Sequence, residues 1–170
     1  MASAAVDDRP LTEDMLAAHL AEGCKPDSQF RIGAEHEKFV FRLGSHAPVP
    51  YEPQGIKALL ERLMAYGWQG VYEGDNVIAL ERGRANVSLE PGGQFELSGA
   101  PQLTIHDAAL ELDNHLEDCR TIGGPLNIHF LGLGVTPLWG VADIRKMPKS
   151  RYGIMTPYMD KVGTLGTSMM

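Results

Sequence analysis

Residues 87–98, VSLEPGGQFELS, decide which fold this chain can adopt. Apolar and polar side chains alternate on both sides of Pro91–Gly93, which is the pattern of two half-buried strands joined by a turn. If the turn reverses the chain, Glu90 and Glu96 face the polar side of one hairpin while the apolar residues face the core. The stretch therefore predicts an antiparallel hairpin with two carboxylates on its polar face.

The segments around this hairpin predict helices interleaved with short strands. Helices are expected at 12–23, 53–67, 104–123 and briefly after Pro148, and strands within 29–43, 71–98 and 128–135. Pro53 is expected to begin its helix, because a proline at the first helical position costs no hydrogen bond. Hairpin turns dominate the middle of the chain, so the fold class is α+β with a mainly antiparallel sheet rather than a doubly wound parallel one.

The clearest helix is expected after Thr104, whose side chain can cap the first turn. Side chains at helical spacing form one apolar stripe, which comprises Ile105, Ala108, Leu112, Leu116 and Cys119. Cys119 is therefore interpreted as a core residue rather than as a reactive thiol.

Length and composition indicate one compact protein domain. The chain has 170 residues, of which 44% are hydrophobic, and a formal net charge of -7. The acidic balance argues against a nucleic-acid or membrane-surface partner, and no apolar run is long enough to span a membrane. Residues 1–10 are expected to be a flexible tail and residues 11–170 one domain. The two separated cysteines and the lack of a targeting peptide in the first ten residues predict a cytoplasmic protein.

A first pair of carboxylates lies in the sequence EHEKF, which begins at Glu35. On a strand, Glu35 and Glu37 point to the same face, while His36 points away and is interpreted as a hydrogen-bonded structural residue. Like charges so close repel unless a proton or a cation lies between them, and hard oxygen ligands favour Mg²⁺. A solvated edge strand is the other interpretation. The second pair, Glu90 and Glu96, strengthens the metal hypothesis, although an amphipathic hairpin with a wet face also explains it.

A basic stretch follows Asp143 and contains lysines, arginines and tyrosines, among them Lys149, Arg151 and Tyr152. One interpretation is recognition of a substrate carboxylate or phosphate, for which the planar guanidinium of arginine is well suited. The other is a solvated helix face. Several alternative sites are excluded: the chain has no GxxxxGK[ST] phosphate loop, and Val40 breaks the HExxH pattern that His36 begins.

Four stretches resemble, in order, the glutamate–cysteine ligases of plants and proteobacteria. They are IGAEHEKFVF (32–41), VSLEPGGQFELSGAP (87–101), FLGLG (130–134) and MPKSRYGIMTPYMDKVGTLG (147–166). The resemblance implies a glutamine-synthetase-like curved antiparallel sheet with flanking helices, incomplete in this chain. It implies Mg²⁺ ligands at Glu35, Glu37, Glu90 and Glu96, and substrate-binding residues at Lys149, Arg151 and Tyr152.

The activity that the resemblance implies is ATP-dependent joining of the γ-carboxylate of L-glutamate to L-cysteine, the first step of glutathione biosynthesis. It would proceed through a γ-glutamyl phosphate and need no nucleophilic side chain from the protein. Family members are far longer, so the chain is expected to be an N-terminal fragment that is inactive alone. Two alternatives stay open: a truncated product that serves only in association, and an unrelated Mg²⁺-dependent phosphoryl-transfer or hydrolytic enzyme.

Overall fold

A computed structural model describes residues 10–170, which fall into two units that meet between Arg31 and Ile32. The first unit contains helix α1 (Glu13–Ala21) and a 3-10 turn (Asp27–Gln29). Met15 donates its backbone N–H to Thr12 Oγ1 at 3.2 Å, so Thr12 caps the helix expected at 12–23. Nine of the ten residues of the expected flexible tail lie outside the described residues.

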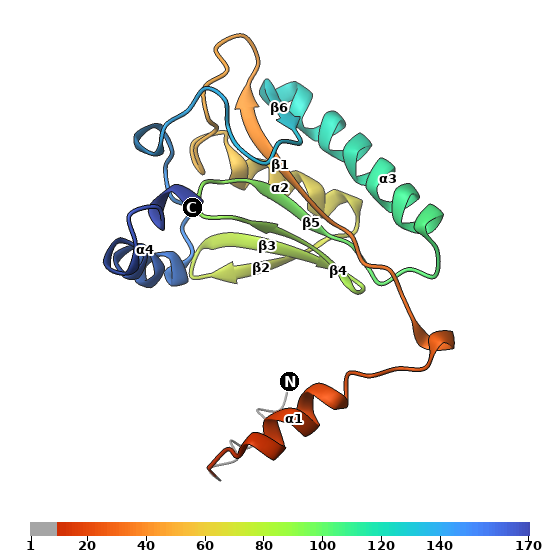
Figure 1. Cartoon of the computed structure of the whole chain (residues 1–170). Coiled ribbons are helices and arrows are strands. Elements are labelled where there is room, and N and C mark those ends of the chain that lie inside the picture. The colour runs from red at the N-terminus through yellow and green to blue at the C-terminus, as the bar shows by residue number, and fades with distance from the viewer. Residues whose placement is uncertain (1–9) are drawn as a thin grey trace. The chain divides into compact units, whose positions relative to one another are not determined.

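The second unit, Ile32–Met170, is built on one six-stranded sheet whose neighbouring strands are all antiparallel (Figure 1). Its strands are β1 (Glu35–Arg42), β2 (Gln69–Glu73), β3 (Asn76–Arg82), β4 (Ala85–Leu89), β5 (Phe95–Ser98) and β6 (Ile128–Leu131). The order across the sheet is β2-β3-β4-β5-β1-β6, so β1 lies between β5 and β6. The predicted α+β class with an antiparallel sheet is confirmed, and this sheet is consistent with part of the glutamine-synthetase-like fold.

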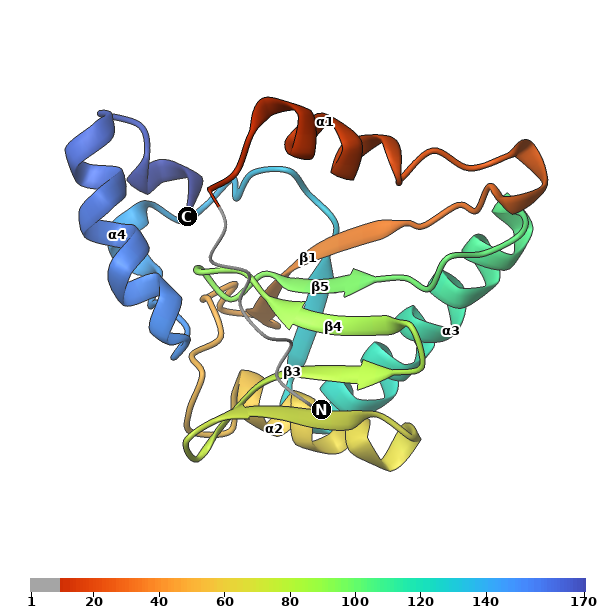
Figure 2. The same ribbon diagram turned by 90° about the horizontal axis from the view of Figure 1, so that it is seen from below.

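Two helices, α2 (Ile56–Leu63) and α3 (Ile105–Gly123), cover one face of the sheet, and both lie behind the strands in Figure 2. A third, α4 (Ser150–Val162), lies beside the ends of the strands (Figure 1). Within residues 32–170, no helix lies over the opposite face. None of the described helices is long and apolar enough to cross a membrane.

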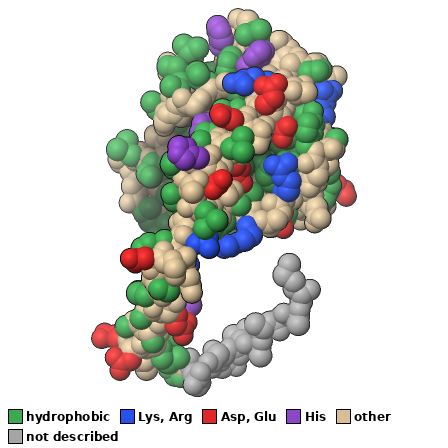
Figure 3. All heavy atoms as spheres, turned by 90° about the vertical axis from the view of Figure 1, so that its right-hand side faces the viewer, with side chains coloured by type: hydrophobic (Ala, Val, Ile, Leu, Met, Phe, Trp, Pro, Cys, Tyr) green, Lys and Arg blue, Asp and Glu red, His purple; other side chains and the backbone are tan. Residues whose placement is uncertain are grey.

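The core lies between the sheet and its two covering helices. Fully buried side chains come from both layers: Leu59, Leu60 and Leu63 of α2, and Leu80, Val87, Leu89 and Phe95 of the strands. Burying a leucine or phenylalanine side chain contributes about 1.5–3 kcal/mol to folding. This packing fixes which face of each strand turns inward, and the polar residues between them are left on the open face. On the α3 side of the molecule, acidic, basic and hydrophobic side chains are interspersed (Figure 3).

The start of α2 differs from the prediction. The helix begins at Ile56, with Gly55 as its N-cap, and Pro53 lies in the loop before it. Ile56 and Lys57 donate their backbone N–H groups to carbonyls of that loop, at Pro50 and Tyr51. A Cβ atom at residue 55 would lie 1.8 Å from the Pro50 oxygen, so the loop can fold back only because a glycine is there.

The buried face of α3 and two element boundaries also differ from the prediction. Ile105 is 61% exposed and His115 is buried, because most of the buried residues of α3, other than Ala108, lie between His115 and Gly123. Strand β6 ends at Leu131, before two glycines that weaken the expected strand to residue 135. The helix after Pro148 has 13 residues and is therefore longer than expected.

Candidate metal and substrate site

The register of the sheet places carboxylates on the open face in direct opposition. Glu37 of β1 pairs with Glu96 of β5, and Glu96 pairs in turn with Ser88 of β4. Side chains directly opposite each other in antiparallel strands have Cβ atoms about 4.5–5.5 Å apart. The prediction that Glu37 and Glu96 share one face of the sheet is confirmed. We call Ser88, Glu96 and Glu37 the carboxylate row.

The next row on the same strands faces the opposite way. Lys38 pairs with Phe95 and Phe95 with Leu89, and all three side chains lie in the core. The Lys38 ammonium donates to the His36 carbonyl at 2.9 Å and lies 3.2 Å from His36 Nδ1. His36 therefore faces away from the glutamates, as predicted. Burial lowers the pKa of Lys38 to about 8.

Three of the predicted metal ligands lie close enough to the fourth, Glu37, to influence it electrostatically. The pKa of Glu37 is raised, first by partial burial and then by the negative charges of Glu96, Glu90 and Glu35. Glu35 lies two residues before Glu37 on β1, and Glu90 directly follows β4. The structure therefore gathers around Glu37 the repulsion that the sequence predicted, and a bound cation would relieve it.

The chemistry of these donors fits Mg²⁺, although they do not form a closed cage. Among the described residues, no three histidine, cysteine, aspartate or glutamate side chains are grouped as a ready ligand set. Mg²⁺ keeps several of its waters and is commonly bound by one or two carboxylates together with substrate phosphates. Glu37 and Glu96 supply such a pair, and Glu35 and Glu90 add negative charge beside it.

Two serines contact this site and were missed in the sequence. The hydroxyl of Ser88 donates to Glu96 Oε2 at 3.0 Å, and that of Ser98 donates to Glu96 Oε1 at 3.1 Å. Their place in the alternating pattern could have revealed them, because Ser88 and Ser98 share the polar face of the hairpin with Glu96.

The start of α4 is joined to the end of β4 by two of the predicted substrate-binding residues. Lys149 and Tyr152 are both buried, and both donate to the carbonyl of Leu89, Lys149 Nζ at 2.8 Å and the Tyr152 hydroxyl at 2.5 Å. The backbone N–H of Ser150 donates to Glu73 Oε2 at 2.7 Å. These contacts fix the first turn of α4 beside the carboxylate face.

Arg151 is the member of this group whose charge is available to a ligand. Its side chain is 64% exposed and lies 4.0 Å from Glu90 Oε1. The guanidinium also donates to the Tyr152 hydroxyl at 3.1 Å and lies over the Tyr152 ring, 5.0 Å from its centroid. Arg151 therefore sits at the edge of the acidic face, where an anionic substrate held by a cation would come within its reach.

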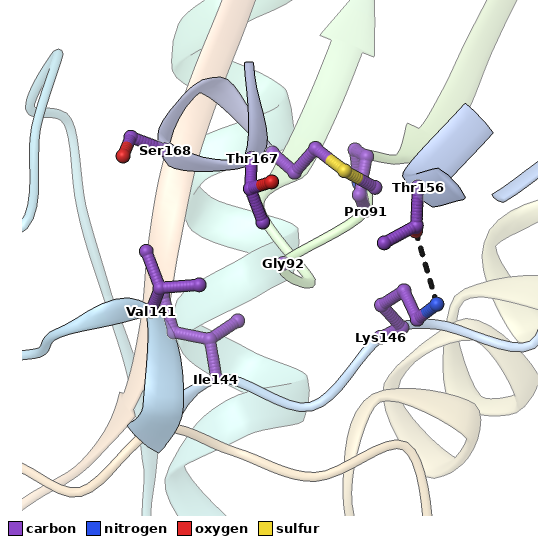
Figure 4. A pocket seen from close by; sticks show the side chains of 9 residues that line it. Pro91, Gly92, Val141, Ile144, Lys146, Thr156, Thr167 and Ser168 are labelled. Atoms are coloured by element: carbon purple, nitrogen blue, oxygen red, sulfur yellow. Dashed lines mark hydrogen bonds between the residues drawn. The ribbon is translucent and has the colours of Figure 1, made fainter. Parts of the chain in front are cut away.

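A cavity of about 240 Å³ borders the turn between Glu90 and Glu96 (Figure 4). It is lined by residues from four segments, namely Pro91, Gly92, Val141, Ile144, Lys146, Thr156, Thr167, Ser168 and Met170. Lys146 donates to the Thr156 hydroxyl at 3.0 Å across one side. The hairpin that carries the carboxylates thus has a cavity at its tip and α4 beside it.

Comparison with protein families agrees with this architecture. The model of glutamate-cysteine ligase family 2 (GCS2) matches residues 31–170, which is nearly the same span as the unit that holds the sheet. The chain belongs to this family.

Curated relatives extend the match to almost the whole chain. It is 48% identical over 169 residues to the chloroplastic glutamate–cysteine ligase of Nicotiana tabacum, covering 98% of this chain and 32% of that protein. The enzyme of the same name from Medicago truncatula is also 48% identical, with 98% and 33% covered, and that from Arabidopsis thaliana is 46% identical, with 98% and 32% covered. The chain spans about a third of the length of these relatives.

The expected cytoplasmic location is wrong, because these relatives are named chloroplastic. The prediction depended in part on Cys24 and Cys119, which are both free thiols in the structure. Free thiols distinguish a reducing compartment from an oxidising one, but they do not distinguish between two reducing compartments. The two cysteines therefore indicate a reducing environment, but they do not identify the organelle.

Proposed function

We propose that this chain provides the acidic, metal-binding part of an ATP-dependent ligase that joins L-glutamate to L-cysteine. Membership of the family and the names of the relatives support the reaction. The observation that carries the proposal is the direct opposition of Glu37 and Glu96 on an open sheet face, with Arg151 at its edge. The same relatives support a plastid location for the protein.

In this proposal, the four glutamates hold Mg²⁺ and Arg151 binds an anionic substrate group. When bound, Mg²⁺ offsets the negative charge of phosphate oxygens. Glu37 and Glu96 are the principal ligands, and Glu35 and Glu90 complete the acidic surface. Lys149 and Tyr152 act on the substrate through Arg151, because their hydrogen bonds to Leu89 fix the turn from which Arg151 projects.

The proposed reaction has two steps that balance without a covalent enzyme intermediate. The γ-phosphoryl group of ATP passes to the side-chain carboxylate of glutamate, and ADP leaves. The cysteine amine then attacks the acyl carbon, loses a proton and releases inorganic phosphate. Positioning and charge stabilisation are the main demands of such chemistry, and an acidic face with an adjacent arginine can meet them.

The test places this chain within a full-length relative. Replacing the matching third of the tobacco enzyme with residues 31–170 should give a chimera that forms γ-glutamylcysteine only when ATP and Mg²⁺ are present. The same chimera with Glu96→Gln should fold and lose turnover. The 170-residue chain alone should form none, because the relatives use about three times its length. A folded chimera that turns over equally well with Glu96→Gln would contradict the proposed site.

A further inference from the structure

Glu96 differs from Glu37 in how its carboxylate is held. Both of its oxygens accept a hydrogen bond, Oε2 from Ser88 on β4 and Oε1 from Ser98 on the same strand, at 3.0 and 3.1 Å. Glu37 lies directly opposite and is exposed, and within the described residues its carboxylate has no hydrogen-bond partner. One carboxylate of the pair is therefore fixed in orientation, and the other is free to rotate.

The chemistry of the two donors suits a metal ligand. A carboxylate offers about four lone-pair sites, so two hydroxyl donors leave the others available to a cation. Serine is neutral, so it orients Glu96 without adding a positive charge that would compete with the cation. Ser88 and Ser98 are half-buried beside Glu96, which restricts the rotamers that they can adopt.

We propose that Ser88 and Ser98 are positioning residues, which fix Glu96 as the rigid ligand of the Mg²⁺ site, while Glu37 is the adjustable ligand. This inference rests on the proposed function, because it assumes that the carboxylate row binds Mg²⁺. Residues that orient a metal ligand typically change metal affinity by about 10–100-fold when they are removed. The two serines together are expected to have an effect of that size, and each alone a smaller one.

The test is a titration of the 170-residue chain with MgCl₂, in which the heat of binding is measured by calorimetry. The Ser88→Ala/Ser98→Ala variant should bind Mg²⁺ about 10–100-fold more weakly than the unchanged chain. The Ser88→Thr/Ser98→Thr variant keeps both hydroxyls and should recover most of the affinity. Ser45→Ala is the matched control: Ser45 lies in an exposed turn, where it accepts only from the Ala47 backbone, and its loss should change nothing.

A double-mutant cycle shows whether the serines act through Glu96. In a Glu96→Gln background, removing both hydroxyls should weaken Mg²⁺ binding no further, because the ligand that they orient is already lost. If the alanine pair fails to fold by circular dichroism, each single alanine variant removes one of the two hydrogen bonds and carries the same comparison.

The outcomes separate this inference from the proposed function. An unchanged chain that binds no Mg²⁺ would contradict the proposed metal site, and the inference with it. An unchanged chain that binds Mg²⁺, together with serine variants that bind it equally well, would overturn the inference alone. Equal losses in the presence and absence of the Glu96 carboxylate would also overturn it, because the serines would then act independently of Glu96.

Discussion

The two faces of strands β1 and β5 hold charged side chains in opposite environments. On the open face, Glu37 and Glu96 lie side by side and repel each other in water. One residue further along, on the covered face, Lys38 is 1% exposed and has only His36 as a hydrogen-bond partner in the described structure. A metal ion can relieve the first arrangement, whereas the second is a fixed cost of packing. The charges of Glu37 and Glu96 are therefore available to a ligand, whereas the charge of Lys38 is enclosed by the fold.

The largest expected effect comes from removing one charge on the open face. In the ligase chimera, Glu37→Gln and Glu96→Gln should each lower turnover by orders of magnitude, because each removes a metal ligand. Extra Mg²⁺ should recover part of the activity where the defect is affinity. The metal-free variants should be at least as stable as the unchanged protein by urea unfolding, because repulsion is relieved. Marked destabilisation would instead indicate structural carboxylates.

Arg151 tests whether the open face extends to α4. Arg151→Ala in the chimera should lower kcat/KM for an amino-acid substrate or ATP by about ten- to one-hundred-and-fifty-fold, because a charge-assisted hydrogen bond contributes about 1.5–3 kcal/mol. Lys161→Ala removes a positive charge from the far end of the same helix and is the matched control. If the two variants behave alike for all three substrates, Arg151 belongs to a solvated basic surface.

On the covered face, the contribution of Lys38 to stability should change with pH in the opposite direction from that of a lysine in a salt bridge. Burial lowers the pKa of Lys38 from 10.5 to about 8. The folded state therefore loses the Lys38 proton at a lower pH than the unfolded chain does. As a result, the contribution of Lys38 to the free energy of unfolding rises with pH between about 8 and 10.5. Lys38→Met should be more stable than the unchanged chain below pH 8. The difference should shrink by about 1 kcal/mol per pH unit above pH 8.

Urea unfolding of the unchanged chain and of Lys38→Met, both without metal and at several pH values, gives the difference in their free energies of unfolding directly. Cys119 does not obscure the comparison, because burial raises its pKa to about 12 and it keeps its proton in the folded state over this pH range. A difference that stays constant between pH 7 and 10 would show that the Lys38 amine is not buried as described.

The smallest effect concerns Glu37 without metal. Its raised pKa means that the folded state holds the proton more tightly than the unfolded chain. The contribution of Glu37 to stability is thus present in acid and lost as the pH rises through its folded pKa. Glu37→Gln should raise the free energy of unfolding at pH 7 by less than about 1 kcal/mol, since exposed charges are screened. The gain should vanish near pH 4, and a gain that persists there would have another cause.

The sequence predicted the open face better than the surroundings of α4. Alternation placed Glu96 on the polar face of its hairpin, because Phe95 and Leu97 on either side of it must enter the core. Glu37 is flanked by His36 and Lys38, so its face was predicted from strand alternation with Glu35. Lys149 and Tyr152 are different: their chemistry suggested a substrate, but both reach the Leu89 carbonyl at the point where β4 ends. That contact depends on where two distant segments meet, which no local pattern contains. Similarly, Ile105 fits the helical stripe but is exposed in the first turn of α3.

Mg²⁺ binding by the 170-residue chain tests the central claim most directly. Calorimetric titration with MgCl₂ should show binding that Glu37→Gln and Glu96→Gln each weaken strongly. Glu81→Gln is the matched control, because Glu81 pairs with Asn86 on the same open face, away from the carboxylate row. An affinity that is unchanged by Glu81→Gln and strongly lowered by each of the other two substitutions is the predicted result. An unchanged chain that binds no Mg²⁺, or equal losses in all three variants, would contradict ligation by the carboxylate row.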